Sequence, residues 1–111
     1  MALPVSHRLQ KELDFKNTLK TGRTVRGDFL FLKFLPKTGI SRFGISVTMK
    51  VSKKATVRNR IRRILSEIIR INVLPKVGGY DTVVVVIRNG LQDIGRMEQD
   101  LVRAFQQAGI I

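Results

Sequence analysis

Apolar residues recur along this chain with two spacings, one typical of helices and one typical of strands. The first helix is predicted over residues 11–20 and ends at Gly22, because glycine is common just after the last helical turn. Phe15 and Leu19 are four positions apart in this helix and should share one face. Residues 23–35 are dense in Phe and Leu and predict extended structure.

Three strands are predicted in more detail. Residues 23–26 form a short edge strand before a Gly-Asp turn, and residues 42–49 alternate and are rich in strand-forming residues. Residues 81–87 (DTVVVVI) are apolar on both faces, which is typical of a central, covered strand. Alternation over residues 29–34 places Phe29, Phe31 and Lys33 on one face and Leu30, Leu32 and Phe34 on the other, without indicating which face is the core.

The middle of the chain predicts an amphipathic helix, because its apolar positions recur every three or four residues. Thr56 is its expected N-cap, and the helix should end near Asn72, before Pro75. A closing helix is expected over residues 94–108. This succession predicts an α+β fold in which helices pack on a small sheet. The apolar positions of the middle helix are Val57, Ile61, Ile64, Leu65, Ile68 and Ile71.

The 111 residues suffice for one domain with a modest core, and the 43% hydrophobic fraction argues for a folded chain. The sequence holds no cysteine, which excludes disulfides, thiolate zinc sites and a cysteine nucleophile. No repeat or linker divides the chain, so residues 1–111 should form a single domain. No secretory segment is visible and the longest aliphatic run, residues 83–87, is too short to span a bilayer, so we expect a cytoplasmic protein.

Charge is strongly unbalanced, with 21 Lys and Arg against 8 Asp and Glu, a formal net charge of +13. It is concentrated in the middle: residues 29–66 contain ten basic residues and no acidic one. Such a concentration is typical of proteins that bind nucleic acid. An anionic membrane is the alternative ligand, but the chain needs its aliphatic residues for a core.

The densest charge is RNRIRR at residues 58–63, which holds four arginines and one asparagine. A run of like charge is either a solvated helix face or a docking surface for a polyanion. The second interpretation is favoured, because the planar arginine fork suits bidentate phosphate contacts and no acid follows before Glu67. On a helix, Arg58 and Arg62 lie on one flank of the apolar stripe, Arg60 and Arg63 on the other, and Asn59 opposite it.

Other residues give weaker signals. The phenylalanines are either core residues or a stacking platform for single-stranded bases. His7 is the only histidine and has no evident partners for a metal site. No nucleophilic triad and no Walker or dinucleotide-binding pattern is present, so no catalytic residue is expected in the protein. Lys50, Lys53 and Lys54 lead into the middle helix and extend its positive surface.

Four segments together resemble the protein subunit of bacterial ribonuclease P. RNRIRR at residues 58–63, after a strand, resembles the Arg-Asn-Arg helix of that family. HRLQKELDF at residues 7–15, followed by Gly22, is similar to its N-terminal helix. FGISVTMK at residues 43–50 resembles the end of one strand, and GGYDTVVVVIRNG at residues 78–90 resembles another. The likeness covers nearly the whole chain.

The resemblance implies an αβββαβα order with a left-handed βαβ crossover. It implies a subunit of the ribonuclease P ribonucleoprotein, an endoribonuclease that removes the 5′ leader of precursor tRNA during tRNA processing. The catalytic RNA and its Mg²⁺ would carry the hydrolysis, with no cofactor bound by a protein motif. The implied partners are the catalytic RNA and precursor tRNA, with no membrane and no protein partner.

The resemblance also implies residue roles. Leu19 and the vicinity of Leu32 lack aromatic residues usual in the family, and Met49 replaces a customary lysine. The segment between Lys50 and Arg58 is one residue longer than expected for the family. The resemblance therefore does not distinguish whether Lys53 or Lys54 matches the family's basic residue. Contacts to the RNA subunit would come from Arg58, Asn59, Arg60, Arg62, Arg63, Lys53 and Lys54. The leader-binding cleft would contain Phe15, Leu19, Leu32 and Lys50. The main alternative is a ribosomal-type RNA-binding protein of similar fold, and a more distant one is a membrane-surface or DNA-compacting basic protein.

Overall fold

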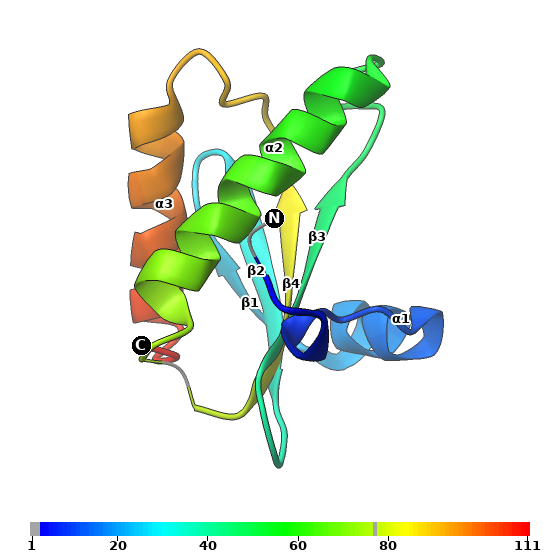
Figure 1. Cartoon of the computed structure of the whole chain (residues 1–111), viewed down its shortest axis with the longest axis vertical. Coiled ribbons are helices and arrows are strands. Elements are labelled where there is room, and N and C mark those ends of the chain that lie inside the picture. Colours follow the sequence, from blue (N-terminus) through cyan, green and yellow to red (C-terminus); the bar gives the residue numbers. More distant parts are fainter. Residues whose placement is uncertain (1–2, 77) are drawn as a thin grey trace.

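The computed structural model describes residues 3–76 and 78–111. A four-stranded sheet with the order β1-β2-β4-β3 forms its centre (Figure 1). Strand β2 pairs antiparallel with β1 and β4, whereas β3 and β4 are parallel. The strands are β1 (Arg23–Arg26), β2 (Leu30–Pro36), β3 (Arg42–Val47) and β4 (Tyr80–Val86). The helices are α1 (Glu12–Thr21), α2 (Ala55–Ile68) and α3 (Ile94–Gln107), with a short 3₁₀ turn, η1 (Val5–His7), and a π-helical turn, η2 (Ile69–Val73).

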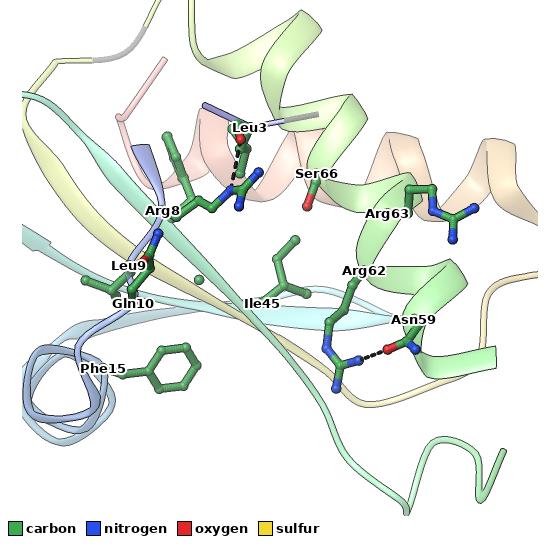
Figure 2. A pocket seen from close by; sticks show the side chains of 12 residues that line it. Leu3, Arg8, Leu9, Gln10, Phe15, Ile45, Asn59, Arg62, Arg63 and Ser66 are labelled. Carbon is green, nitrogen blue, oxygen red and sulfur yellow. Dashed lines mark hydrogen bonds between the residues drawn. The ribbon is translucent and has the colours of Figure 1, made fainter. Parts of the chain in front are cut away.

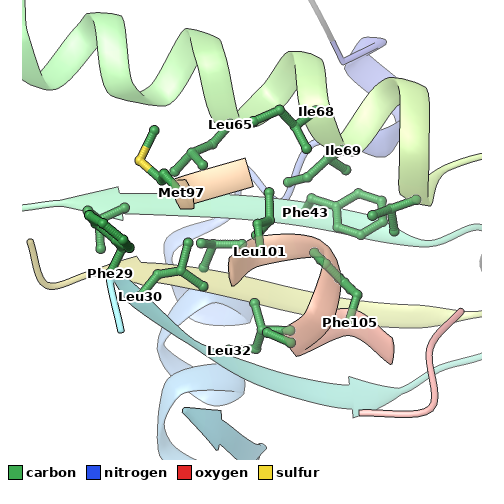
Figure 3. Close-up of a cluster of buried hydrophobic side chains, with 14 of the residues drawn as sticks. Phe29, Leu30, Leu32, Phe43, Leu65, Ile68, Ile69, Met97, Leu101 and Phe105 are labelled. Carbon is green, nitrogen blue, oxygen red and sulfur yellow. The ribbon is translucent and has the colours of Figure 1, made fainter. Parts of the chain in front are cut away.

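Helices α2 and α3 cover one face of the sheet, and the core lies between them and the strands (Figure 3). Leu30 and Leu32 point into this core and are fully buried, whereas Phe31 and Lys33 lie on the opposite face and stay partly exposed. This assigns the two faces of β2, which the alternation alone left open. The prediction that Phe29 shares a face with Phe31 and Lys33 is wrong, because Phe29 precedes β2 and is buried in the core. Strand β4 is central and largely buried, as its apolar sequence predicted.

The connection from β3 through α2 to β4 is left-handed. In Figure 1 both strands point upward, α2 passes in front of them, and β4 lies to the left of β3. Crossovers between parallel strands are right-handed in nearly all proteins, so this feature is distinctive. The observed αβββαβα order and the crossover both agree with the fold that the family resemblance implies.

Two features of the middle helix differ from the sequence prediction. Its N-cap is Lys54 rather than Thr56, and no side chain caps it. Beyond α2 the chain continues as a π-helical turn, in which the Leu74 N–H donates to the Ile69 carbonyl at 2.9 Å. This wider turn shifts the residues after Ile69 around the helix axis, because it contains more residues than an α-helical turn, and Val73 is the next buried residue. Ile69 lies four positions after the buried Leu65 and is buried as well, and the prediction that Ile71 belongs to the apolar face is wrong, since Ile71 is 56% exposed.

Gly22 ends α1 as predicted, but for a different reason. Its φ of −70° is accessible to any residue, so a left-handed cap does not require glycine here. A Cβ at this position would lie 2.5 Å from the Thr18 oxygen and 3.0 Å from the Phe34 nitrogen. Glycine is needed because the chain passes this close to other backbone atoms. The short edge strand β1 follows at once, as expected.

Candidate nucleic-acid interface

A cavity of about 500 Å³ opens where the N-terminal segment, α1, β3 and α2 meet (Figure 2). Phe15 lines it from α1, Ile45 from β3 and Asn59 from α2. Arginines at positions 8, 62 and 63 also line it, and none of the described lining residues is acidic. A cavity that combines an aromatic ring with several cations suits an anionic ligand that has planar apolar groups.

Phe15 reaches this cavity because β3 has a glycine opposite it. A Cβ at Gly44 would lie 2.5 Å from the Phe15 Cε2 atom, so only glycine lets the ring come this close to the strand. The ring remains partly exposed on the cavity side. Its position is suited to stacking on a base, which is worth about 1–3 kcal/mol per base in single-strand binding.

Arg42 holds α1 in place on the sheet. Its guanidinium donates to both carboxylate oxygens of Asp81, at 2.9 and 2.7 Å, and to Asp14 of α1 at 3.2 Å. Hydrogen bonding to Asp81 raises the pKa of the Arg42 side chain, so this group stays charged at any physiological pH. The hydrogen bonds of Arg42 to Asp81 and Asp14 link α1 to β3 and β4 and thereby set the position of Phe15.

Two of the four motif arginines are oriented by contacts inside the protein. Arg62 donates to the Asn59 Oδ1 atom at 2.7 Å (Figure 2). It also donates to the Val47 carbonyl at 3.2 Å. Arg58 donates to the Ser52 carbonyl at 3.0 Å and so ties the segment before α2 to the helix. These bonds reduce the freedom of both side chains, which lowers the entropy lost when they bind a ligand.

Arg60 and Arg63 are exposed, and within the described chain neither makes a hydrogen bond or an ion pair. Figure 2 shows the Arg63 side chain extending away from that of Arg62. All donors of Arg60 and Arg63 are therefore available to an external anion such as phosphate. The motif thus contains an oriented pair, Arg58 and Arg62, and a free pair, Arg60 and Arg63, a division that follows the two flanks predicted from the sequence.

The lysines of residues 48–54 lie outside the cavity. Lys50, Lys53 and Lys54 are all exposed in the segment that leads from β3 into α2. The Lys54 N–H donates to the Ser52 Oγ atom at 3.2 Å, which further orders this segment. These side chains extend the positive surface of the α2 N-terminus, as the sequence predicted, but Lys50 does not line the cavity beside Phe15.

The predicted leader cleft is only partly assembled. Phe15 lines the cavity, whereas Leu19 is partly buried on α1 and is not among the lining residues. The prediction for Leu32 is wrong, because its side chain is completely buried in the core between β2 and α3 (Figure 3). Leu32 points to the α2–α3 face of the sheet, whereas Phe15 packs on the opposite face.

Sequence reasoning missed Arg8 as a residue of this site. Its Nε atom donates to the Leu3 carbonyl at 2.9 Å, and the neighbouring Leu9 N–H donates to the Phe43 carbonyl at 2.9 Å. The pairing with Phe43 brings the N-terminal segment to the free edge of β3. No local pattern in residues 7–10 indicates such a long-range contact. His7 donates from Nδ1 to the Ser41 carbonyl at 2.8 Å.

Two further observations concern other kinds of site. Across residues 3–76 and 78–111, no three His, Asp or Glu side chains come together as a metal-binding group. No helix in the described part of the chain is long and apolar enough to cross a membrane.

Comparison with known proteins decides the family. The family model described as ribonuclease P matches residues 3–109. The chain belongs to the ribonuclease P protein family. It is 38% identical over 115 residues to the ribonuclease P protein component of Synechocystis, covering all of this chain and 92% of that protein. It is 41% identical over 95 residues to the component of Microcystis aeruginosa, covering 81% of this chain and 78% of the relative.

Solved structures of the family have the same fold. The ribonuclease P protein of Thermotoga maritima superposes with a TM-score of 0.78 at 29% identity, covering 90% of this chain and 96% of that chain. The Staphylococcus aureus protein gives a TM-score of 0.82 at 23% identity, covering 94% and 96%. These similarities agree with the α+β fold and place the chain in an RNA-processing family.

Proposed function

We propose that this protein is the RNA-binding subunit of a ribonuclease P ribonucleoprotein that matures the 5′ end of tRNA in the cytoplasm. The arginine face of α2 binds the catalytic RNA, and the cavity beside Phe15 binds the 5′ leader of precursor tRNA. One observation carries this proposal above the others: a single cavity joins the Phe15 ring to Asn59, Arg62 and Arg63, and no acidic residue lines it.

The protein contributes binding and orientation. Arg60 and Arg63 offer free guanidinium groups to the phosphates of the catalytic RNA, and Lys53 and Lys54 extend this contact. Phe15 offers a ring face to a leader base. The catalytic RNA, with its Mg²⁺ ions, supplies the chemistry of phosphodiester hydrolysis. By holding leader and RNA together, the protein raises the fraction of substrate bound in the reactive position.

Reconstitution tests this proposal. The full chain is added to a ribonuclease P RNA transcript, and cleavage of precursor tRNA is measured over a range of Mg²⁺ concentrations. We expect the protein to increase cleavage at low Mg²⁺, and an Arg60→Ala, Arg63→Ala double variant to lose most of this increase. Lys76→Ala, which removes an exposed cation beyond η2, is the matched control and should retain it.

The alternative of a general RNA-binding protein gives a different result. Such a protein binds the transcript without increasing cleavage at any Mg²⁺ concentration, and it co-sediments with ribosomal particles. A membrane-surface protein instead prefers anionic vesicles over RNA in competition. Either outcome would overturn the proposal.

A further inference from the structure

The free edge of β3 carries main-chain groups that the fold leaves without a partner. β3 pairs with β4 on one side, and the N–H and C=O groups of alternate residues point to the other side. The Phe43 carbonyl accepts from Leu9 and the Val47 carbonyl accepts from Arg62, so these two residues point outward. Ile45 lies midway between them and must point the same way.

Ile45 has no main-chain partner on this side among the described residues. The N-terminal segment pairs with β3 only as far as Leu9, because the chain then turns into α1 at Glu12. The next contact along this edge of β3 is made by Arg62, which donates to the Val47 carbonyl. The N–H and C=O of Ile45 therefore lie in the gap between these two contacts, and the cavity opens onto the same residue (Figure 2).

An exposed donor and acceptor on an edge strand are a binding site for an extended or planar partner. Charge decides which partner fits. Arg8, Arg62 and Arg63 line the cavity and none of the described lining residues is acidic, so a nucleotide strand is favoured over a basic or neutral peptide. The Phe15 ring, which packs against Gly44 beside Ile45, favours a planar base in the same place.

We propose that the main chain of Ile45 binds the hydrogen-bonding edge of one base of the single-stranded 5′ leader. The N–H donates to the base and the C=O accepts from it, while the arginines meet the adjoining phosphates. This inference rests on the proposed function. Each of the four RNA bases presents a donor beside an acceptor on its Watson–Crick edge, so the contact requires a base at one leader position without strongly selecting its identity.

The first test removes each side of the proposed hydrogen bond in turn: the leader base and the N–H of Ile45. Precursor tRNAs with a single abasic nucleotide at successive leader positions are bound to the reconstituted complex. The protein is wild type, Ile45→Pro or Ile45→Val. Proline removes the outward N–H and leaves the pairing with β4 intact, because this group takes no part in that pairing, and edge strands tolerate proline there; it also replaces the isoleucine side chain, which packs against the core. Valine keeps both main-chain groups and a β-branched side chain, so Ile45→Val is the matched control.

We expect one leader position at which base removal weakens binding to the wild type and to Ile45→Val about tenfold. Ile45→Pro should bind the intact leader several-fold more weakly, and base removal at that position should weaken its binding by clearly less than tenfold, because only the C=O contact and the Phe15 stack remain to be lost. If every abasic position has the same effect in all three proteins, the inference is wrong. The proposed function stands in that case, provided that the protein still increases cleavage at low Mg²⁺.

A second measurement does not depend on the proline variant folding. Amide hydrogen exchange of Ile45 is followed in the wild-type chain as single-stranded leader RNA is added. We expect exchange at Ile45 to slow on binding. Unchanged exchange at Ile45 while the RNA is bound overturns the inference. So does stronger protection by an acidic peptide than by RNA, since the edge would then be a peptide site.

Discussion

The Arg62 guanidinium donates to the Asn59 Oδ1 atom at 2.7 Å, one turn earlier on the same helix. A second bond from Arg62 reaches the Val47 carbonyl at 3.2 Å, so the side chain joins α2 to the end of β3. Asn59 is itself exposed and uncharged. Asn59 therefore holds the Arg62 guanidinium in place beside the cavity, in addition to any contact that Asn59 itself makes with RNA.

Replacing Asn59 with alanine should weaken RNA binding without changing its salt dependence. The loss should be about 0.5–1.5 kcal/mol, the net value of one hydrogen bond, because Arg62 becomes freer. The slope of log affinity against log salt reports the number of neutralised phosphates and should stay constant, since no charge is removed. Affinities measured at several salt concentrations check this. A shallower slope would mean that Arg62 no longer reaches the RNA at all.

Replacing Arg60 with alanine should change both quantities. The substitution removes the bidentate phosphate contact that we propose for Arg60, so affinity should fall by about 1–3 kcal/mol, and the salt slope should become shallower by about one. The same filter-binding or fluorescence titration measures both values. Lys76→Ala serves as the control, because it removes one charge at a site that we place outside the interface. Equal effects of the two substitutions would show that only net charge matters.

The elements of this fold could be predicted because their patterns are local. The spacing in residues 57–68 requires only that one helix face be buried, and the run in residues 81–87 requires only that a strand be covered on both sides. The π-helical turn after Ile68 could not be predicted this way. It changes the period of the helix for a few residues, and within it Ile69 and Val73 are buried while Ile71 is exposed.

The site depends on contacts between distant segments, and these limit what sequence can show. Leu32 and Phe31 alternate along β2, and only the packing of α3 decides that Leu32 is the buried one. Arg8 reaches the cavity through a pairing with Phe43, which lies 35 positions away. Asn59, Arg62 and Arg63 were predicted to contact the RNA subunit, and that role stays a prediction; they line one cavity together because one helical segment carries them all.

Replacing Gly44 with alanine should displace the Phe15 ring. The new Cβ would lie 2.5 Å from the Cε2 atom, so the ring or the strand must move, at a cost of about 1–3 kcal/mol in the free energy of unfolding. Leader affinity should fall in the same variant, since the ring leaves its place in the cavity. Denaturant unfolding and leader binding measure the two effects.

Gly95→Ala is the matched control for this substitution. Gly95 lies in the first turn of α3, and a Cβ there meets nothing within 4 Å. Alanine is favoured over glycine in helices, so this variant should be at least as stable as the wild type. If Gly44→Ala behaves like Gly95→Ala in both measurements, the close contact with Phe15 does not restrict position 44.

Replacing Asp100 with asparagine should destabilise the junction between α3 and the turn before β2. Each carboxylate oxygen accepts one main-chain N–H, from Asp28 and Phe29, both at 2.9 Å, and the residue is only 2% exposed. An amide offers one acceptor and leaves the other N–H facing a donor, which costs about 1–3 kcal/mol. Urea unfolding measures this loss. Asp93→Asn, an exposed position, should change stability little.

Replacing Thr82 with valine should stabilise the protein. Thr82 is fully buried, and its Oγ1 atom has no hydrogen-bond partner among the described residues. Valine has nearly the same shape and removes the desolvated hydroxyl, so the free energy of unfolding should rise by about 1 kcal/mol.

Thr18→Val is the contrasting substitution, because the Thr18 hydroxyl is also buried but donates to the Asp14 carbonyl at 2.9 Å. This variant loses a made hydrogen bond, so its free energy of unfolding should fall. Thermal and urea unfolding of both variants provide the comparison. A decrease in stability for Thr82→Val would show that the hydroxyl has a partner in solution, such as a buried water molecule.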